Sequence, residues 1–176
     1  DITGDLTFEA WVKLESLGSS NTNLTIVDKQ DARQTDVAYS FYLRNSAAND
    51  DLNLMLSTDG STNVAPFSVE SALRSGTWVY YAVVFSTVTP KTVRFYVYDA
   101  QPAYNVEHPP INQIHNNNED FRIGARSIPG GAMAFTDLLD GKIDEVRIWN
   151  VARTHSEIVD NYRRELTGNE SRLVAY

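Results

Sequence analysis

The stretch LTFEAWVK, residues 6–13, alternates apolar and mostly polar side chains. Successive side chains of a β-strand point to opposite faces, so this alternation predicts a strand with one buried face. The same pattern recurs in four further segments, residues 24–27, 37–43, 52–56 and 92–98. Clusters of Gly, Ser, Asn and Asp separate several of these segments and mark turns. Short strands with frequent turns predict an all-β fold, an antiparallel β-sandwich or barrel.

Two other segments refine this prediction. Residues 78–85, WVYYAVVF, are apolar on both strand faces, which predicts a central strand with its outer side under a second cover or an aromatic-floored groove. Near the C-terminus, Thr154 and Glu157 form the Ser/Thr-x-x-Glu pattern of a capping box. Apolar residues follow at a spacing of four up to Leu166, and Gly168 is a stop signal. We therefore expect one short C-terminal helix of about three turns, laid on the sandwich.

Length and charge limit the classes of partner. The chain has 176 residues, which predicts a single domain over residues 1–176. Its 15 basic and 23 acidic side chains give a formal net charge of −8 at pH 7, and the basic residues are spread along the chain. Nucleic acid and anionic membranes need a positive surface, so we expect no nucleic acid as a partner. No apolar run approaches the roughly 20 residues of a membrane span, so we also expect no membrane insertion.

The composition also bears on redox chemistry and location. The chain contains no cysteine, which excludes disulfides, thiolate metal sites and cysteine nucleophiles but leaves an oxygen-ligated ion open. Its polar residues lean toward Asn, Asp, Ser and Thr, with few Lys. This balance favours a secreted or cell-surface module over a cytosolic enzyme.

Residues 141–150, GKIDEVRIWN, carry a resemblance to a known family. Four further segments match in the same order along the chain, LTFEAWV (6–12), TWVYYAVVF (77–85), VRFYV (93–97) and FRIG (121–124). Together they resemble the laminin G-like, concanavalin A-like jelly-roll modules of secreted and surface proteins. The resemblance implies a jelly roll of two packed antiparallel sheets. Such modules include lectins, carbohydrate-binding appendages, adhesion repeats and enzymes, so function follows from the fold far less directly.

The enzymatic branch of the family can be tested on particular residues. Glucanases of the family-16 type carry Glu-x-Asp-x-Glu or Glu-x-Asp-x-x-Glu on one strand, and this sequence has no such triplet. Asp144 and Glu145 are adjacent, so they should point to opposite faces of a strand. The three histidines show no metal-ligand spacing and no obvious serine partner. We expect a protein that is not an enzyme.

The resemblance implies a calcium site at one position. In related glucanase sandwiches, the Asp of a closing Val-Asp-x-Val-Arg-Val segment binds calcium, and residues 143–148 place Asp144 there. Calcium takes six to eight oxygen ligands, so Glu9 and Asp140 are further candidates for a structural Ca²⁺ site. The alternative is that Asp144 is a polar position paired with an Arg or a backbone amide. The pentraxin type of paired-calcium site is not expected, because its acidic run is replaced here by Ala125-Arg126-Ser127-Ile128.

Sugar binding needs an aromatic platform together with planar polar groups. Six residues are candidates for ligand binding: Arg94, Tyr96, Tyr98, Trp11, Asn116 and Asn117. Arg94, Tyr96 and Tyr98 share one face of their strand, and the two asparagines lie in the long segment 99–120. The alternative is cross-strand aromatic packing with no ligand.

These observations favour a non-catalytic extracellular module that recognises glycans or another surface polymer. The alternative is a structural repeat of a tandem adhesin or filament, which contacts neighbouring copies. In modules of this type a Leu-Val-Ala-Tyr strand normally precedes the segment equivalent to residues 6–12, yet here it stands at residues 173–176. Residues 172–176 are therefore predicted to be a strand shared with, or leading into, a next module. It would pair at a sheet edge, within its own chain or on a neighbour.

Overall fold

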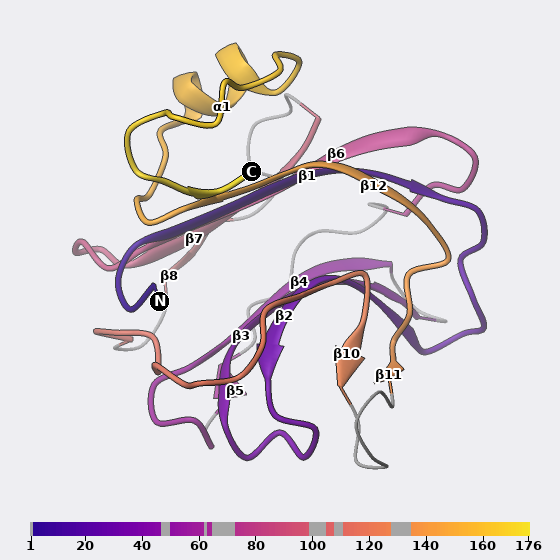
Figure 1. Cartoon of the computed structure of the whole chain (residues 1–176), viewed down its shortest axis with the longest axis horizontal. Helices are drawn as coiled ribbons and strands as arrows, with labels where there is room; N and C mark the ends of the chain where they lie inside the picture. Colours follow the sequence, from indigo (N-terminus) through magenta and orange to yellow (C-terminus); the bar gives the residue numbers. More distant parts are fainter. Residues whose placement is uncertain are drawn as a thin grey trace.

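Two antiparallel β-sheets pack face to face in the computed structural model (Figure 1). The structure describes residues 2–46, 50–61, 63–64, 73–98, 105–107, 111–127 and 135–176. The six-stranded sheet contains, in spatial order, β13 (Leu173–Ala175), β12 (Gly141–Trp149), β1 (Leu6–Leu14), β6 (Trp78–Ser86), β7 (Thr92–Val97) and β8 (Asn105–Glu107). The five-stranded sheet contains β5 (Asn63–Val64), β4 (Asp51–Ser57), β3 (Val37–Asn45), β2 (Thr22–Gln30) and β9 (Arg122–Ile123). A two-stranded hairpin pairs β10 (Arg126–Ser127) with β11 (Phe135–Thr136), and the predicted antiparallel β-sandwich is confirmed.

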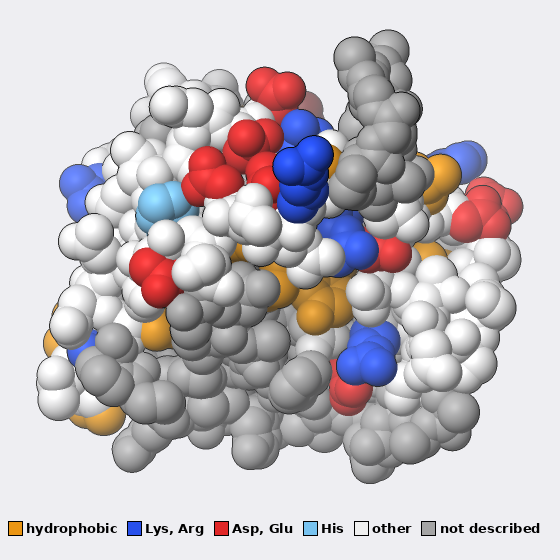
Figure 2. Space-filling view, turned by 90° about the horizontal axis from the view of Figure 1, so that it is seen from below, with side chains coloured by type: hydrophobic (Ala, Val, Ile, Leu, Met, Phe, Trp, Pro, Cys, Tyr) orange, Lys and Arg blue, Asp and Glu red, His pale blue; other side chains and the backbone are white. Residues whose placement is uncertain are grey.

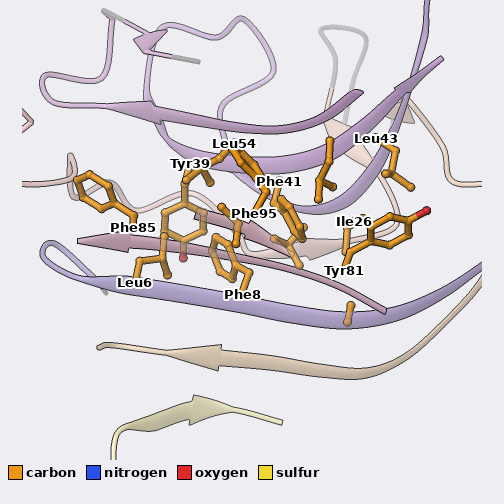
Figure 3. Packing of buried hydrophobic residues seen from close by; sticks show 14 of the residues in the cluster. Leu6, Phe8, Ile26, Tyr39, Phe41, Leu43, Leu54, Tyr81, Phe85 and Phe95 are labelled. Atoms are coloured by element: carbon orange, nitrogen blue, oxygen red, sulfur yellow. The ribbon is translucent and has the colours of Figure 1, made fainter. Parts of the chain in front are cut away.

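The main hydrophobic core lies between the two sheets (Figure 3). The Phe8 ring contacts the rings of Tyr39 and Phe41 on β3, with ring centroids 5.1 and 6.2 Å apart. The four apolar side chains of the first stretch are all at most 1% exposed: Leu6, Phe8, Ala10 and Val12. Full burial of one large apolar side chain contributes about 1.5–3 kcal/mol. The alternation in residues 6–13 therefore determines which face of β1 meets the five-stranded sheet.

The helix α1 (His155–Asn161) covers the outer face of the six-stranded sheet (Figure 1). A second buried cluster forms beneath it, made of Tyr80, Ala82, Val84, Tyr96, Ile158 and Tyr162. The central strand predicted at residues 78–85 is thus β6, with the core on one side and the helix on the other. Among the described residues, no helix is long and apolar enough to cross a membrane.

The predicted capping box at the start of α1 is confirmed. The Thr154 side chain accepts a hydrogen bond from the Glu157 amide, and the Glu157 carboxylate accepts one from the Thr154 amide at 2.7 Å. The helix is shorter than the three turns predicted, because it ends at Asn161. The Arg147 guanidinium donates hydrogen bonds to the backbone carbonyls of Asn161 and Arg164. These carbonyls therefore need no donors from further helical turns.

A β-bulge interrupts the pairing of β12 with β1. Glu9 lies opposite Arg147, but Trp11 lies opposite Asp144, so β12 has one extra residue between these pairs. Within the bulge Glu145 has a φ of 52°, and its Oε2 accepts a hydrogen bond from Arg147 Nη2 at 2.7 Å. The simple alternation expected for Asp144 and Glu145 does not hold, because a bulge breaks the period of two.

The C-terminal residues form the outer strand of the six-stranded sheet. Leu173 and Ala175 of β13 pair with Trp149 and Ile148 of β12. The Tyr176 hydroxyl donates to Glu145 Oε1 at 2.7 Å and accepts from the Leu166 amide at 3.1 Å. Of the two pairings predicted for this strand, the structure shows the one within its own chain. Its relation to a next module remains a prediction.

Deletion of residues 172–176 should lower the free energy of unfolding by about 1–3 kcal/mol, because a few hydrogen bonds of about 0.5–1.5 kcal/mol each are lost. Urea denaturation at neutral pH measures this. Tyr176→Phe is the milder control, since it removes only the hydroxyl bonds to Glu145 and Leu166. A deletion variant with the parent's stability would show that β13 pairing contributes nothing to the fold.

Candidate ligand-binding site

The outer face of the five-stranded sheet carries two cross-strand rows of side chains. The ladder places these residues directly opposite one another, in one row Asp28, Ser40 and Met55, and in the other Thr25, Tyr42 and Asn53. Residues that alternate with them along the strands, such as Phe41 and Leu54, face the core. Directly opposite residues share a face of the sheet, so both rows point away from the core.

A hollow of about 200 Å³ lies over these rows. Its walls are eight side chains, Asn23, Thr25, Gln34, Ser40, Tyr42, Met55, Arg126 and Asp137, and we call it the Tyr42 pocket. Figure 2 views the molecule from the side of this sheet and shows apolar side chains near the centre of the face, with charged side chains of both signs around them. The pocket therefore combines an aromatic ring, amides, hydroxyls and one pair of opposite charges.

The charged pair lies beside the hairpin of β10 and β11. Arg126 Nη2 is 3.0 Å from Asp137 Oδ2, and Asn23 Nδ2 donates to the same oxygen at 3.3 Å. The Asp137 backbone is fixed as well, because its carbonyl accepts from the Thr25 amide at 3.0 Å. The guanidinium and the carboxylate are thus held against β2 in one arrangement.

The floor beside the pocket holds buried polar groups. Asp28 is fully buried, and its Oδ1 accepts from Gln30 Nε2 at 2.7 Å. Burial raises the pKa of Asp28 to about 6, against the opposing effects of Ser40, Gln30 and two arginines. In the described part of the chain, Asp28 Oδ2, Gln30 Oε1 and both amide atoms of Asn53 have no hydrogen-bond partner. Such groups are rare in folded proteins, and perturbed carboxyls concentrate at functional sites.

The loop of residues 31–36 brings Gln34 to the rim. Asp31 Oδ1 accepts from the amides of Thr35 and Asp36 at 2.6 and 2.9 Å. Although burial alone would raise it, these hydrogen bonds hold the pKa of Asp31 below its ordinary value. The carboxylate therefore stays ionised at neutral pH and orders the loop before any ligand arrives.

The aromatic residues predicted to bind sugar lie on the other sheet. Tyr96 is fully buried and stacks on the His155 ring at 5.9 Å. Trp11 stacks on Tyr162 at 6.1 Å, and its Nε1 donates to the Tyr162 carbonyl at 2.8 Å. For Tyr96 the prediction of an open sugar face is wrong, because the segment carrying α1 covers its ring, and the packing alternative describes it correctly. Trp11 is only partly buried and lines a hollow of about 340 Å³ with Glu145, Arg147 and Tyr162, so its role in ligand binding stays a prediction.

The remaining predicted ligand residues are not gathered into one site. Arg94 Nη2 donates to the Arg153 carbonyl at 3.2 Å, and the half-buried Tyr98 donates from its hydroxyl to the Trp78 carbonyl at 3.2 Å. Asn117 is buried beside the five-stranded sheet, where Lys29 Nζ donates to its Oδ1 at 2.9 Å. Asn116 is exposed in the same segment. The two asparagines thus lie in a loop beside the five-stranded sheet, away from the tyrosines at the six-stranded sheet.

The three carboxylates proposed for calcium do not fit a shared metal shell. Glu9 is fully buried and is bound by Arg147, Arg153 and the Tyr80 hydroxyl, which donates to its Oε2 at 2.5 Å. Asp140 Oδ2 accepts from the Ser16 hydroxyl at 2.6 Å. Asp144 is exposed, and its Oδ1 accepts from the Glu145 amide at 2.9 Å, as its alternative prediction required. The described residues contain no group of three acidic or histidine side chains placed to hold a metal.

Sequence reasoning did not select the residues of the Tyr42 pocket. Alternation in residues 37–43 places Tyr42 and Ser40 opposite Phe41, which was a usable signal for an outward-facing aromatic ring. Arg126 and Asp137 gave no such signal. Their pairing depends on the hairpin and on the register between distant segments.

A family model described as the concanavalin A-like lectin/glucanases superfamily matches residues 1–159. The search of curated proteins found no match. Many solved structures are similar to this chain, among them the following three. A heptameric SAP-like pentraxin from Limulus polyphemus has 20% identity and a TM-score of 0.62, and the match covers 90% of this chain and 70% of the pentraxin. A protein from Bacteroides ovatus, provisionally described as carbohydrate-binding, has 20% identity and a TM-score of 0.71, and the match covers 100% of this chain and 46% of that protein. The CBM40 domain of the Ruminococcus gnavus IT-sialidase, bound to α2,3-sialyllactose, has 12% identity and a TM-score of 0.65, and the match covers 90% of this chain and 83% of that domain. At these identities the likeness is one of fold, and this chain spans less than half of the Bacteroides protein.

Proposed function

Because this chain belongs to the concanavalin A-like lectin/glucanases superfamily, we propose that it is a carbohydrate-binding module without catalytic activity and that the Tyr42 pocket is its sugar site. The chemistry of the pocket carries the proposal. A pyranose ring presents C–H groups on its faces and hydroxyls at its edges, so it is bound by an aromatic or apolar surface with polar groups around it. Tyr42 and Met55 supply the aromatic and apolar surface. Asn23, Gln34 and Ser40 supply the polar groups.

The protonation state of Tyr42 suits this role. Burial raises the pKa of the Tyr42 hydroxyl above its ordinary value, so the group remains a neutral donor and acceptor at neutral pH. The solved structure of a CBM40 domain with sialyllactose supports the proposal at the level of the fold, since that domain also binds a sugar on a sandwich of this type.

Tyr42→Ala should weaken glycan binding at least about tenfold, which corresponds to about 1.4 kcal/mol, because the aromatic contact is lost. A glycan array with the wild-type chain identifies a ligand, and titration calorimetry then compares the variants. Tyr98→Ala, on the other sheet, is the matched control and should bind like wild type. The proposal fails if wild type binds no glycan, or if Tyr42→Ala folds normally and keeps wild-type affinity.

We place this module outside the cell, as a secreted or cell-surface domain. The composition rich in Asn, Asp, Ser and Thr supports this location, and so does a ligand class that is abundant on cell surfaces and in extracellular polymers.

A role as a structural repeat is the second candidate. One observation favours it, the outer position of β13 in its sheet with Val174 half exposed. An edge strand of this kind can pair with a strand of a neighbouring copy. Sedimentation analysis of the 172–176 deletion variant, beside the stability measurement above, separates this role from sugar binding.

A further inference from the structure

We infer that the Tyr42 pocket selects uncharged sugars over acidic sugars, and that Asp137 is the residue that sets this selectivity. The inference rests on the proposed function and adds the class of ligand. It is carried by the way charges are arranged on the outer face of the five-stranded sheet.

The arginine that lines the pocket has a carboxylate beside it. Arg126 is paired with Asp137 at 3.0 Å, and both side chains are about four-fifths buried. Arg44 lies directly opposite Asp51 in the ladder between β3 and β4. A pair shielded from water interacts more strongly than an exposed pair, so the Arg126 guanidinium is already committed.

The third arginine of this face is committed in the same way. Arg122 lies opposite Asp28 in the ladder, and its Nη1 donates to the carbonyls of Gln30 and Asp120 at 3.2 and 3.0 Å. Its Nη2 is also 3.7 Å from Asp120 Oδ2. Neither Arg126 nor Arg122 can therefore bind an incoming carboxylate through its terminal nitrogens without disturbing an existing contact.

The surrounding charge opposes an anion as well. Asp28 lies one strand from the pocket residue Ser40 and is ionised at neutral pH and above, since its raised pKa is about 6. The whole chain carries a formal net charge of −8, which disfavours the approach of anions. A carboxylate placed here would lose its water without gaining a counter-ion, a costly exchange.

Neutral hydroxyls match the groups that remain. The Tyr42 hydroxyl and the side-chain amide of Gln34 line the pocket, and both kinds of group donate and accept hydrogen bonds. The hollow of about 200 Å³ is smaller than the ~300–1,000 Å³ of pockets for drug-sized ligands. One sugar ring, at a chain end or in a branch, is the unit that fits.

The experiment compares sugars that differ by one carboxylate. Methyl glycosides of glucose, galactose and mannose are each titrated against the corresponding uronic acid, with binding followed by ligand-observed NMR. We expect wild type to bind at least one neutral glycoside about tenfold or more tightly than its uronic acid. Binding of the neutral glycoside should not change between about 0.05 and 0.5 M salt, because screening affects only charged ligands strongly.

Asp137→Asn tests the assigned residue. The change keeps the side-chain shape and suits the backbone, because Asp137 has a φ of 50° and Asn tolerates positive φ well. It releases Arg126 from its counter-ion, so binding of the uronic acid should strengthen about tenfold or more relative to the neutral sugar. Asp160→Asn is the matched control, since it removes the same charge at an exposed carboxylate of α1, over the other sheet, and should leave the preference unchanged.

The outcomes separate this inference from the function on which it rests. Wild type that binds uronic acids as tightly as neutral sugars overturns the inference and leaves the sugar site standing. A folded Asp137→Asn variant with an unchanged preference overturns the role of Asp137. If that variant does not fold, Arg126→Gln replaces it, and a loss of uronic acid binding relative to wild type would show that Arg126 was available all along. No binding of any glycan by wild type overturns both proposals.

Discussion

Arg147→Ala should lower the free energy of unfolding by about 3–5 kcal/mol, the range expected when one partner of a buried ion pair is removed. The Arg147 side chain is only 1% exposed and holds together three parts of the molecule. It contacts Glu9 Oε2 on β1 at 3.4 Å, Glu145 Oε2 in the bulge at 2.7 Å and the Asn161 carbonyl at the end of α1 at 3.0 Å. The variant loses all of these contacts and leaves buried acceptors without donors.

Urea denaturation at pH 7 measures this loss. Arg164→Ala is the matched control, because it removes an exposed arginine from the same C-terminal segment and should change stability by less than about 0.5 kcal/mol. Equal stability of the two variants would refute the importance assigned to Arg147.

The Glu9 cluster, made of Glu9, Tyr80, Arg147 and Arg153, explains the size of this effect. The Glu9 carboxylate lies between the two guanidinium groups, and Arg153 also donates to the Glu157 carbonyl of α1 at 2.7 Å. Burial, together with the neighbouring Glu9 charge, raises the pKa of the Tyr80 hydroxyl well above its ordinary value, so Tyr80 stays a donor to Glu9. The cluster therefore fastens α1 to the outer face of the six-stranded sheet.

Asp28→Asn should raise the free energy of unfolding by about 3 kcal/mol above pH 7. The pKa of Asp28 is raised from 3.8 to about 6 by burial, and one pKa unit corresponds to about 1.36 kcal/mol. The folded state thus binds the proton more tightly than the unfolded chain, so ionisation of Asp28 destabilises the fold as the pH rises through about 6. The amide variant carries no such charge and keeps the shape of the side chain.

The stability difference between wild type and Asp28→Asn should depend on pH. Wild type should gain stability relative to Asp28→Asn as the pH falls from about 7 to about 3, and the two should converge near pH 3, below the ordinary pKa of 3.8, where Asp28 is protonated in both the folded and the unfolded state. Thermal melts across this range measure the difference, with Asp120→Asn as the exposed control. A constant difference between wild type and Asp28→Asn at all pH values would contradict the assignment.

A carboxyl that destabilises the fold beside a pocket is typical of binding sites, where residues needed for function often lower the free energy of unfolding. The same calorimetric titration that tests Tyr42 therefore shows whether Asp28→Asn gains stability at the expense of sugar affinity.

The sequence predicts the inner faces of the strands better than the outer ones. Alternation places Phe8 and Phe41 in the core correctly, because one face of every strand in a sandwich must be apolar. Tyr42 and Tyr96 look alike in this pattern, since both alternate with core residues. Only the docking of α1 distinguishes them, and it leaves Tyr42 in a pocket while it buries Tyr96.

The candidate metal site shows a second limit of local patterns. Spacing along the chain gives no hint that Glu9 meets Arg147 and Arg153, because those contacts join residues far apart in the sequence. The extra residue in the β12 bulge also changes which side chains lie near Asp144. Register and bulges depend on the whole sheet, so the donor set around a carboxylate cannot be derived from one strand.

The pairing of β1 with β12 also affects how the chain reaches this structure. The Thr7 hydroxyl donates to the Val151 carbonyl across 144 residues, and the whole β1–β12 ladder joins segments separated in this way. Contacts between such distant segments are slow to form, because the entropy of closing the intervening chain is lost before the contacts are gained. On the ribosome, β1 emerges before every other described strand, yet one of its edges stays open until Gly141–Trp149 has been synthesised. β1, which lies inside the finished six-stranded sheet, therefore has one unpaired edge while most of residues 1–176 are being synthesised.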